Sequence, residues 1–482
     1  MSETARPKPR NTGFLYLPME IAARELDSRL LIALFAVRQG LEAVIGQKWL
    51  LQANMAFVPA GLWIFKTLTP GDARHMMRAR ALGHRVAAID EEMPGLAEGC
   101  GRLRWVDRRS VEASDHIFCL GQVHRDAMQA KFPDHAQKLV VAGNPRWDLL
   151  RPELRSLYAR DAEAIRAKYG RMILVNTNIG LINSAKNSAD AQIRSLARDG
   201  RIDLSVQEDR DFIDNLKRFE TANFSAAKRL VPRLQSEFPD HSIVLRPHPT
   251  ERLEPYLAEL AKLERVHVVH EGPAAAWLSA SEALVHTSCT TATEAYALER
   301  TAVCYQTVAS PLHDYFLSGK LSLVAESEDA VVQVLRAALR QPGNASYRKR
   351  CDPVFHRFFA AQEGALSAER IAAAAAAALG AETAGGETRG MAKWKPDWRF
   401  RTVWSPSAFQ RRIFPDFSET EIEERLAALA QAAGFRDVPR VMKAGDGQYH
   451  LFAKQLAPPR PIKRTRFPFL RFLAGAEGRP GP

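Results

Sequence analysis

A histidine fixed between two prolines is the sharpest chemical signal in this sequence. The run Arg246-Pro247-His248-Pro249 stands at the end of a predicted strand. Two prolines restrict the backbone, so the imidazole of His248 is held in a set direction. The guanidinium of Arg246 offers a planar fork of N–H donors that suits phosphate. The pair predicts contact with a nucleotide monophosphate or diphosphate, although a turn whose histidine only bonds the backbone explains the pattern equally well.

A second signal is a hydroxyl-rich run that follows the predicted strand 283–286 and opens a helix. It contains Ser288, Thr290 and Thr291. Hydroxyl groups and free backbone N–H groups at the start of a helix favour an anion. Glu294, one turn further on, could accept hydrogen bonds from ribose hydroxyls. A capped helix with a buried glutamate is the plain alternative, because Ser and Thr are common caps.

Three consecutive acids, Asp90, Glu91 and Glu92, follow the predicted strand 85–89. Crowded carboxylates raise one another's pKa, which suits a general base or a nucleophile. An exposed acidic loop is the more ordinary interpretation.

Two amide side chains, Asn176 and Asn178, stand at and just beyond the end of the predicted strand 172–176. They could orient a sugar or a phosphate, or they could simply form a turn. The sequence has no P-loop, no GxGxxG after a strand, and no HExxH, EF-hand or GxSxG pattern. This disfavours kinases, dinucleotide oxidoreductases, zinc proteases and α/β-hydrolases, and no metal site is predicted.

Two series of apolar runs, separated by helical patterns, must position these residues. Alternation of apolar strands with helices predicts parallel sheets covered on both faces. The predicted domains are a Rossmann-like domain at 12–150 and a second one at 170–345, which meet near 143–170. Ligands of open parallel sheets bind beyond the carboxyl ends of the strands, so we expect a site in the cleft between the domains. The predicted strands are 14–17, 43–45, 62–65, 85–89, 116–120, 139–142, 172–176, 243–246, 267–270, 283–286 and 302–305.

The pattern changes after about residue 343. A helical segment is predicted at 346–380, and a linker with a basic, aromatic tail at 381–482, interrupted by a short helix at 419–433. Aromatic rings among Lys and Arg suit a membrane–water interface. Packing onto the first domain as a strap is an alternative of equal weight. The aromatic residues are Trp394, Trp398, Trp404, Phe467, Phe469 and Phe472.

The bulk composition sets the class of protein. The 482 residues carry 67 Lys and Arg against 55 Asp and Glu, a net charge of +12 that attracts polyanions. No nucleic-acid module with interleaved aromatics is recognisable, so no nucleic-acid partner is expected. Five isolated cysteines, no signal peptide and no apolar run long enough to span a bilayer predict a cytoplasmic protein.

Six segments taken together resemble one known family. In order they are RELDSRLLIAL, IDEEMPG, VAGNPRWDLL, ILVNTN, VLRPHP and HTSCTTATEA. Over roughly residues 12–345 this set resembles the surface carbohydrate biosynthesis protein family, which is similar to bacterial capsule β-Kdo transferases. The resemblance extends more distantly to bacterial sialyltransferases and to CDP-glycerol glycerophosphotransferases. The second, QP-type motif of the capsule transferases has no evident counterpart here.

The resemblance implies a metal-independent GT-B glycosyltransferase, with the nucleotide in the second domain and the acceptor in the first. It implies that His248 and the hydroxyls of the run 288–291 contact the donor phosphate. Glu294 would lie on the ribose side, and the acids at 90–92 would face the acceptor. A nucleotide sugar, favoured as a CMP-linked acidic sugar such as Kdo, would be the donor, with no bound cofactor.

The implied acceptor is a glycan or a lipid-linked glycan of a surface polysaccharide. An enzyme acting on it would be peripheral at the inner face of the inner membrane. Three other functions stay open at this point. They are a CDP-polyol phosphotransferase of the same architecture, a nucleotide-sugar epimerase, and a non-catalytic basic scaffold.

Overall fold

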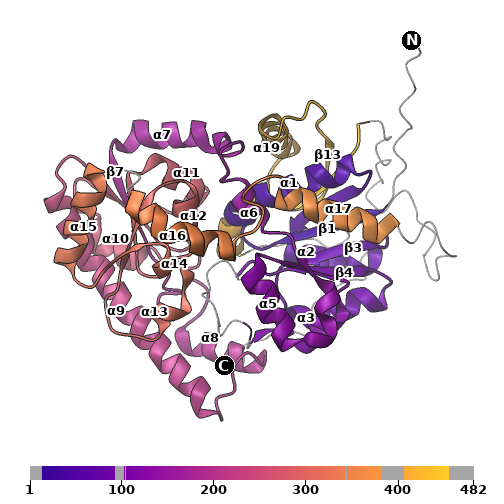
Figure 1. Cartoon of the computed structure of the whole chain (residues 1–482), viewed down its shortest axis with the longest axis horizontal. Helices are drawn as coiled ribbons and strands as arrows, with labels where there is room; N and C mark the ends of the chain where they lie inside the picture. Colours follow the sequence, from indigo (N-terminus) through magenta and orange to yellow (C-terminus); the bar gives the residue numbers. More distant parts are fainter. Residues whose placement is uncertain (1–12, 93–102, 104, 342–344, 381–406, 455–482) are drawn as a thin grey trace.

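A computed structural model describes residues 13–92, 103, 105–341, 345–380 and 407–454. It has two sheets, and each forms the centre of one lobe (Figure 1). The first sheet has eight strands in the order β13-β14-β2-β1-β3-β4-β5-β6, and the second has six in the order β12-β11-β10-β7-β8-β9. Within the described residues no helix is long and apolar enough to cross a membrane.

The first lobe holds the strands β1 (Phe14–Met19), β2 (Glu42–Gln47), β3 (Gly61–Phe65), β4 (Arg85–Ile89), β5 (His116–Cys119) and β6 (Leu139–Val141). These six pair in parallel. The helices between them are α1 (Ala22–Arg38), α2 (Lys48–Asn54), α3 (Pro70–Ala81), α4 (Arg108–Ala113) and α5 (Gln122–Lys131). Every residue of β1, β2 and β3 is buried, as expected for apolar strands covered on both faces.

The second lobe holds the strands β7 (Met172–Asn176), β8 (Ser242–Arg246), β9 (Val266–Val268), β10 (Ala283–His286), β11 (Thr301–Tyr305) and β12 (Leu323–Ala325). All of their pairings are parallel. The helices are α8 (Ala189–Arg198), α9 (Gln207–Glu237), α10 (Glu254–Leu260), α11 (Ala274–Ala280), α12 (Thr291–Ala297), α13 (Leu312–Tyr315), α14 (Leu317–Lys320) and α15 (Glu328–Arg340).

Two connections join the lobes. The chain leaves the first sheet through α6 (Pro145–Asp148) and α7 (Ala159–Tyr169), and it returns through α16 (Ala345–Phe358) and α17 (Ser367–Gly380) (Figure 1). The return passes close to the first lobe, because a Cβ on Gly121 would lie 2.3 Å from the carbonyl oxygen of Phe358. Gly143 has a φ of +90°, a conformation that glycine adopts without steric cost.

The C-terminal segment differs from the predicted linker and tail. Residues 407–454 form α18 (Ala408–Ile413), α19 (Glu419–Ala432) and a hairpin of β13 (Arg440–Gly445) and β14 (Gln448–Phe452). Strand β14 pairs antiparallel with β2, so the hairpin extends the first sheet. The first lobe is therefore built from two separate parts of the chain, and the predicted range 12–150 was incomplete.

Helices α17 and α19 both pack on α1, which is buried along nearly its whole length. The short helix predicted at 419–433 corresponds to α19. The aromatic residues of the predicted tail all lie outside the described residues, so their membrane role stays a prediction.

Candidate active site between the two sheets

The carboxyl ends of β8, β10 and β7 carry most of the side chains predicted to bind a donor. The acids 90–92 follow β4 on the first sheet. The charges of Arg24 and Glu92 in the first lobe both act on His248 in the second. The structure therefore brings the acidic loop and the histidine loop to face one another.

The imidazole of His248 is neutral at pH 7 and carries its proton on a defined nitrogen. Burial and, to a smaller extent, the charge of Arg24 lower the pKa of His248 to about 4. The backbone N–H of Thr250 donates to His248 Nδ1 over 3.3 Å. Because Nδ1 accepts, the proton sits on Nε2. No described residue hydrogen-bonds Nε2, so it is a donor available to a ligand.

A buried carboxylate that the sequence analysis missed holds this loop. Glu251 accepts from the backbone N–H groups of His248 and Ile179, both over 3.0 Å. It also accepts from the hydroxyls of Thr177, over 2.8 Å, and Tyr256, over 2.7 Å. The signal in the sequence that could have identified Glu251 is its position three residues after His248.

Arg246 is buried behind the histidine loop. Its Nη2 donates to the carbonyl oxygen of Gly272 over 2.5 Å. Its Nε is buried without a hydrogen-bond partner among the described residues. Burial lowers the pKa of Arg246, while the charge of Glu294 raises it. A buried guanidinium with an unpaired N–H suits an anion.

The hydroxyl-rich loop divides into engaged and available groups. Thr291 Oγ1 accepts from Asn176 Nδ2 over 2.9 Å and donates to the Cys289 sulfur over 3.1 Å, so its hydroxyl is not free for phosphate. The hydroxyls of Ser288 and Thr290 make no hydrogen bond to a described residue. Neither does the amide of Asn178, which is half-buried.

The backbone at Ser288 is strained. Its φ is +119°, which is uncommon for a residue with a side chain. The Ser288 N–H donates to His286 Nδ1 over 3.1 Å, and His286 Nε2 lies 2.8 Å from Ser322 Oγ. This buried relay holds the turn and fixes the direction of the loop after β10.

Each of the three predicted acids has a partner of its own. Glu91 is buried in an ion pair with Arg29 over 2.8 Å. Asp90 is buried and accepts from the backbone N–H of Glu92 over 3.0 Å. Glu92 pairs with Arg24 over 3.0 Å, and its side chain is 41% exposed. Of the three, only Glu92 combines an ion pair with a partly exposed side chain.

Arg146 joins the two lobes. It forms a buried ion pair with Glu294, and it lies 3.9 Å from Glu91. Glu294, predicted to contact ribose, therefore binds an arginine here. Arg146 lies in the segment VAGNPRWDLL, but it was not predicted to be a site residue. The pairing joins positions 148 residues apart, which no local pattern reveals.

A further cation that was not predicted follows a strand of the first sheet. Lys66, just after β3, bonds Glu20 over 2.8 Å and Glu25 over 3.0 Å. Although burial opposes it, the charges of Glu25 and Glu20 raise the pKa of Lys66. The charged side chains described at these strand ends of the first lobe are therefore paired with one another. Among the described residues, no group of three His, Cys, Asp or Glu side chains could hold a metal ion.

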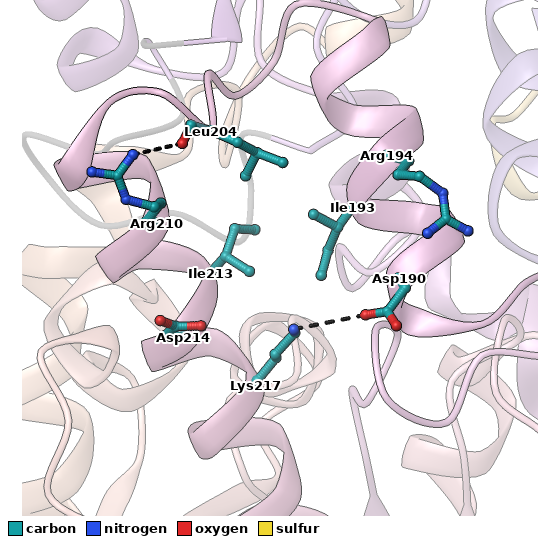
Figure 2. A pocket seen from close by; sticks show the side chains of 8 residues that line it. All are labelled: Asp190, Ile193, Arg194, Leu204, Arg210, Ile213, Asp214 and Lys217. Atoms are coloured by element: carbon teal, nitrogen blue, oxygen red, sulfur yellow. Dashed lines mark hydrogen bonds and ion pairs between the residues drawn. The ribbon is translucent and has the colours of Figure 1, made fainter.

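A separate hollow of about 310 Å³ lies between α8 and α9. Figure 2 shows Ile193 and Ile213 pointing toward one another across it, with Asp190 paired to Lys217 at its edge. None of the predicted site residues lines this hollow.

Comparisons with known proteins support the architecture. No model of a known protein family matches the sequence, and no curated protein matches it. Two solved structures of the wall teichoic acid polymerase TagF, soaked with CDPG, superpose with TM-scores of 0.51 and 0.50. Their identities are 11% and 12%, and the matches cover 78% and 80% of this chain and 90% and 92% of the TagF chains. The chain has the GT-B fold.

This confirms the predicted fold class of two parallel-sheet, Rossmann-like domains. A UDP-GlcNAc 2-epimerase from Neisseria meningitidis, solved with UDP-GlcNAc, also superposes, with a TM-score of 0.46 and 12% identity. That match covers 75% of this chain and 98% of the epimerase chain.

Proposed function

We propose that this protein is a metal-independent glycosyltransferase that moves a sugar from a nucleotide-activated donor onto a glycan or lipid-linked acceptor of a surface polysaccharide. The supporting observation is the placement of His248, a neutral donor with a free Nε2–H, beside the buried Arg246 and opposite Glu92. A CMP-linked acidic sugar such as Kdo is the donor that we propose to test first. TagF, which shares the fold, was soaked with CDPG, so cytidine nucleotides belong in the same panel.

The second lobe would hold the donor phosphate. Arg246 supplies a positive charge with an unpaired N–H, and His248 supplies Nε2–H. The hydroxyls of Ser288 and Thr290 are available to the same phosphate. These groups would stabilise the charge that develops on the departing nucleotide.

The first lobe would activate the acceptor. Glu92 takes the proton of an acceptor hydroxyl as that oxygen bonds to the anomeric carbon. The bond between the anomeric carbon and the phosphate oxygen breaks, and its electron pair leaves with the nucleotide. Arg24, which is paired with Glu92, would hold the carboxylate in place.

A donor assay tests the proposal. CMP-, CDP-, UDP- and GDP-linked donors are incubated with and without a lipid-linked glycan acceptor, and both nucleotide release and acceptor mass are measured. We expect release that depends on the acceptor, with the mass of one sugar added. Addition of a polyol phosphate would instead assign the chain to phosphotransfer, and an isomerised donor without acceptor would assign it to epimerisation.

Two histidine variants separate a specific role from a general effect. His248→Ala should lower transfer about a hundredfold, since one group that stabilises developing charge is lost. His356→Ala is the matched control, because His356 is exposed on α16. Equal activity of the two variants would remove His248 from the proposal.

A further inference from the structure

A second hollow, of about 580 Å³, opens beside the histidine loop. Its walls come from the loop at Ala185, from the start of α10, and from α18 in the C-terminal segment. These stretches are far apart in sequence, and α18 lies beyond the part of the chain that resembles a known family. The hollow is within the range of volumes that small-molecule sites have.

The hollow lies against the loop that carries His248. Arg412 Nη2 donates to the carbonyl oxygen of Pro249 over 3.0 Å. The backbone N–H of Ala185 donates to the carbonyl oxygen of Thr250 over 2.7 Å. Both carbonyls belong to residues that directly follow His248. A molecule in the hollow would therefore lie beside the loop that carries His248.

Helix α18 presents a fixed surface to the hollow. Ser407 caps it, with reciprocal bonds to Gln410. Ile413 and Phe414 are buried and anchor its end. Phe409 and Arg412 are three residues apart, so they share one face of the helix. The Arg412 guanidinium lies 5.5 Å from the centre of the Phe409 ring.

The lining combines an aromatic ring with two guanidinium groups. Arg412 uses one nitrogen to hold the histidine loop. The guanidinium of Arg252 forms no hydrogen bond or ion pair with a described residue, although its backbone N–H donates to Asn183 O over 2.9 Å. Free guanidinium forks bind carboxylate or phosphate. The Phe409 ring offers an apolar face to a sugar, and Glu254 can accept from its hydroxyls.

We propose that this hollow binds an anionic saccharide segment of the acceptor, with Arg252 and Arg412 on its acidic groups and Phe409 against a sugar face. This rests on the proposed function, because it places the acceptor chain beside the transfer site. The shared chemistry is a saccharide that carries a carboxylate or a phosphate.

Calorimetric titration of the full chain tests the proposal without any nucleotide donor. The probes are tetragalacturonate for carboxylate, a mannose-6-phosphate oligosaccharide for phosphate, and uncharged maltotetraose. We expect one of the two acidic probes to bind and maltotetraose not to bind. The acidic probe that binds identifies the source of the charge. Equal binding of maltotetraose, or no binding of either acidic probe, would overturn the proposal.

Variants locate the binding. Arg252→Ala should lower the affinity for the acidic probe about tenfold, as expected for one lost charged hydrogen bond. Arg252→Lys should keep part of that affinity. Arg340→Ala, an exposed arginine on α15, is the matched control and should bind as the wild type does. Wild-type affinity in Arg252→Ala would overturn the assignment.

Two further outcomes distinguish this proposal from the one on which it rests. Nucleotide affinity should be unchanged in Arg252→Ala, because Arg252 lies outside the donor contacts. If the protein binds the acidic probe but transfers a sugar from no donor, the saccharide site is supported and the proposed glycosyltransferase activity is contradicted. Binding of anionic vesicles that needs Arg252, with no saccharide binding, would assign the hollow to a lipid headgroup and overturn it.

Discussion

The strand ends of the two lobes that face one another, here called the first and second walls, differ in their chemistry. The first lobe presents charges that are already paired, such as Arg24 with Glu92 and Lys66 with Glu25. The second lobe presents neutral imidazoles and hydroxyls around one buried guanidinium, Arg246. An anion gains more from unpaired donors than from cations that carboxylates already neutralise. The contrast therefore favours phosphate on the second wall and an uncharged hydroxyl, with a proton acceptor, on the first.

The largest expected effect comes from removing that proton acceptor. Glu92→Gln should lower transfer by about 10²-fold or more, since general-base catalysis contributes roughly that much. Nucleotide affinity should stay within about twofold, because the donor lies on the other wall. Glu91→Gln and Asp90→Asn are the comparison variants, measured in the same transfer and binding assays. Normal transfer by all three amide variants would make the acidic loop a structural feature only.

The second expected effect is on the link between the walls. Arg146→Ala leaves Glu294 buried without its cation and should cost about 3–5 kcal/mol of unfolding free energy. Arg108→Ala removes an exposed pair with Glu112 and should cost under about 1 kcal/mol. Chemical denaturation of both variants measures the difference. A loss below about 1 kcal/mol for Arg146→Ala would show that the two walls are not coupled through it.

A smaller effect should appear in the pH dependence of folding stability, which buried histidines of the second lobe control. Burial lowers the pKa of His248 and His270 to about 4 and that of His286 to about 3. Between pH 6.5 and about 4 these histidines bind protons in the unfolded chain but not in the folded chain. Each such histidine therefore removes about 1.4 kcal/mol of stability per pH unit as the pH falls.

Two buried acids oppose this loss. Burial raises the pKa of Glu220 to about 7 and that of Asp148 to about 6, so the folded chain binds these protons more tightly than the unfolded chain does. Stability from them rises as the pH falls toward 4. The histidines outnumber them, so thermal unfolding at pH 5 should begin below that at pH 7. His248→Gln should lose less between these two pH values than the wild type; an equal loss would contradict the histidine assignment.

The smallest expected effect concerns the membrane. Residues 455–482 carry six Lys and Arg against one acid, and each basic residue near an anionic bilayer contributes roughly 1 kcal/mol. Deleting them should lower co-sedimentation with anionic vesicles at low salt, with neutral vesicles as the control. If the full chain ignores anionic vesicles, the predicted membrane role is wrong.

The strands could be predicted largely because they are apolar and buried. All eleven predicted strands correspond to β1–β11, with small differences at their ends, as at β9. Strand β12 was missed because its central residue, Val324, is exposed, so it lacks a buried apolar run. The hairpin β13–β14 was missed although Asp446-Gly447 stands between its strands, a dipeptide typical of tight turns.

The positions of the site residues in the fold could be predicted from the sequence, but most of their ion-pair partners could not. Residues at strand ends could be found because a parallel sheet gathers those ends at one edge. The ion pairs could not be found, since Lys66 meets Glu20 across 46 positions and Arg146 meets Glu294 across 148. Such pairings depend on how α1 and α6 pack, which local sequence does not encode.

Calorimetric titration of nucleotides into the wild type, His248→Ala and Glu92→Gln tests the central claim most directly. At least one of CMP, CDP, UDP and GDP should bind the wild type. His248→Ala should lower the affinity for that nucleotide at least about tenfold, as expected for a lost hydrogen bond to a charged group. Glu92→Gln should bind it as the wild type does. Equal affinity for His248→Ala and the wild type, or no binding of any of the four, would contradict the assignment of the second wall to the donor phosphate.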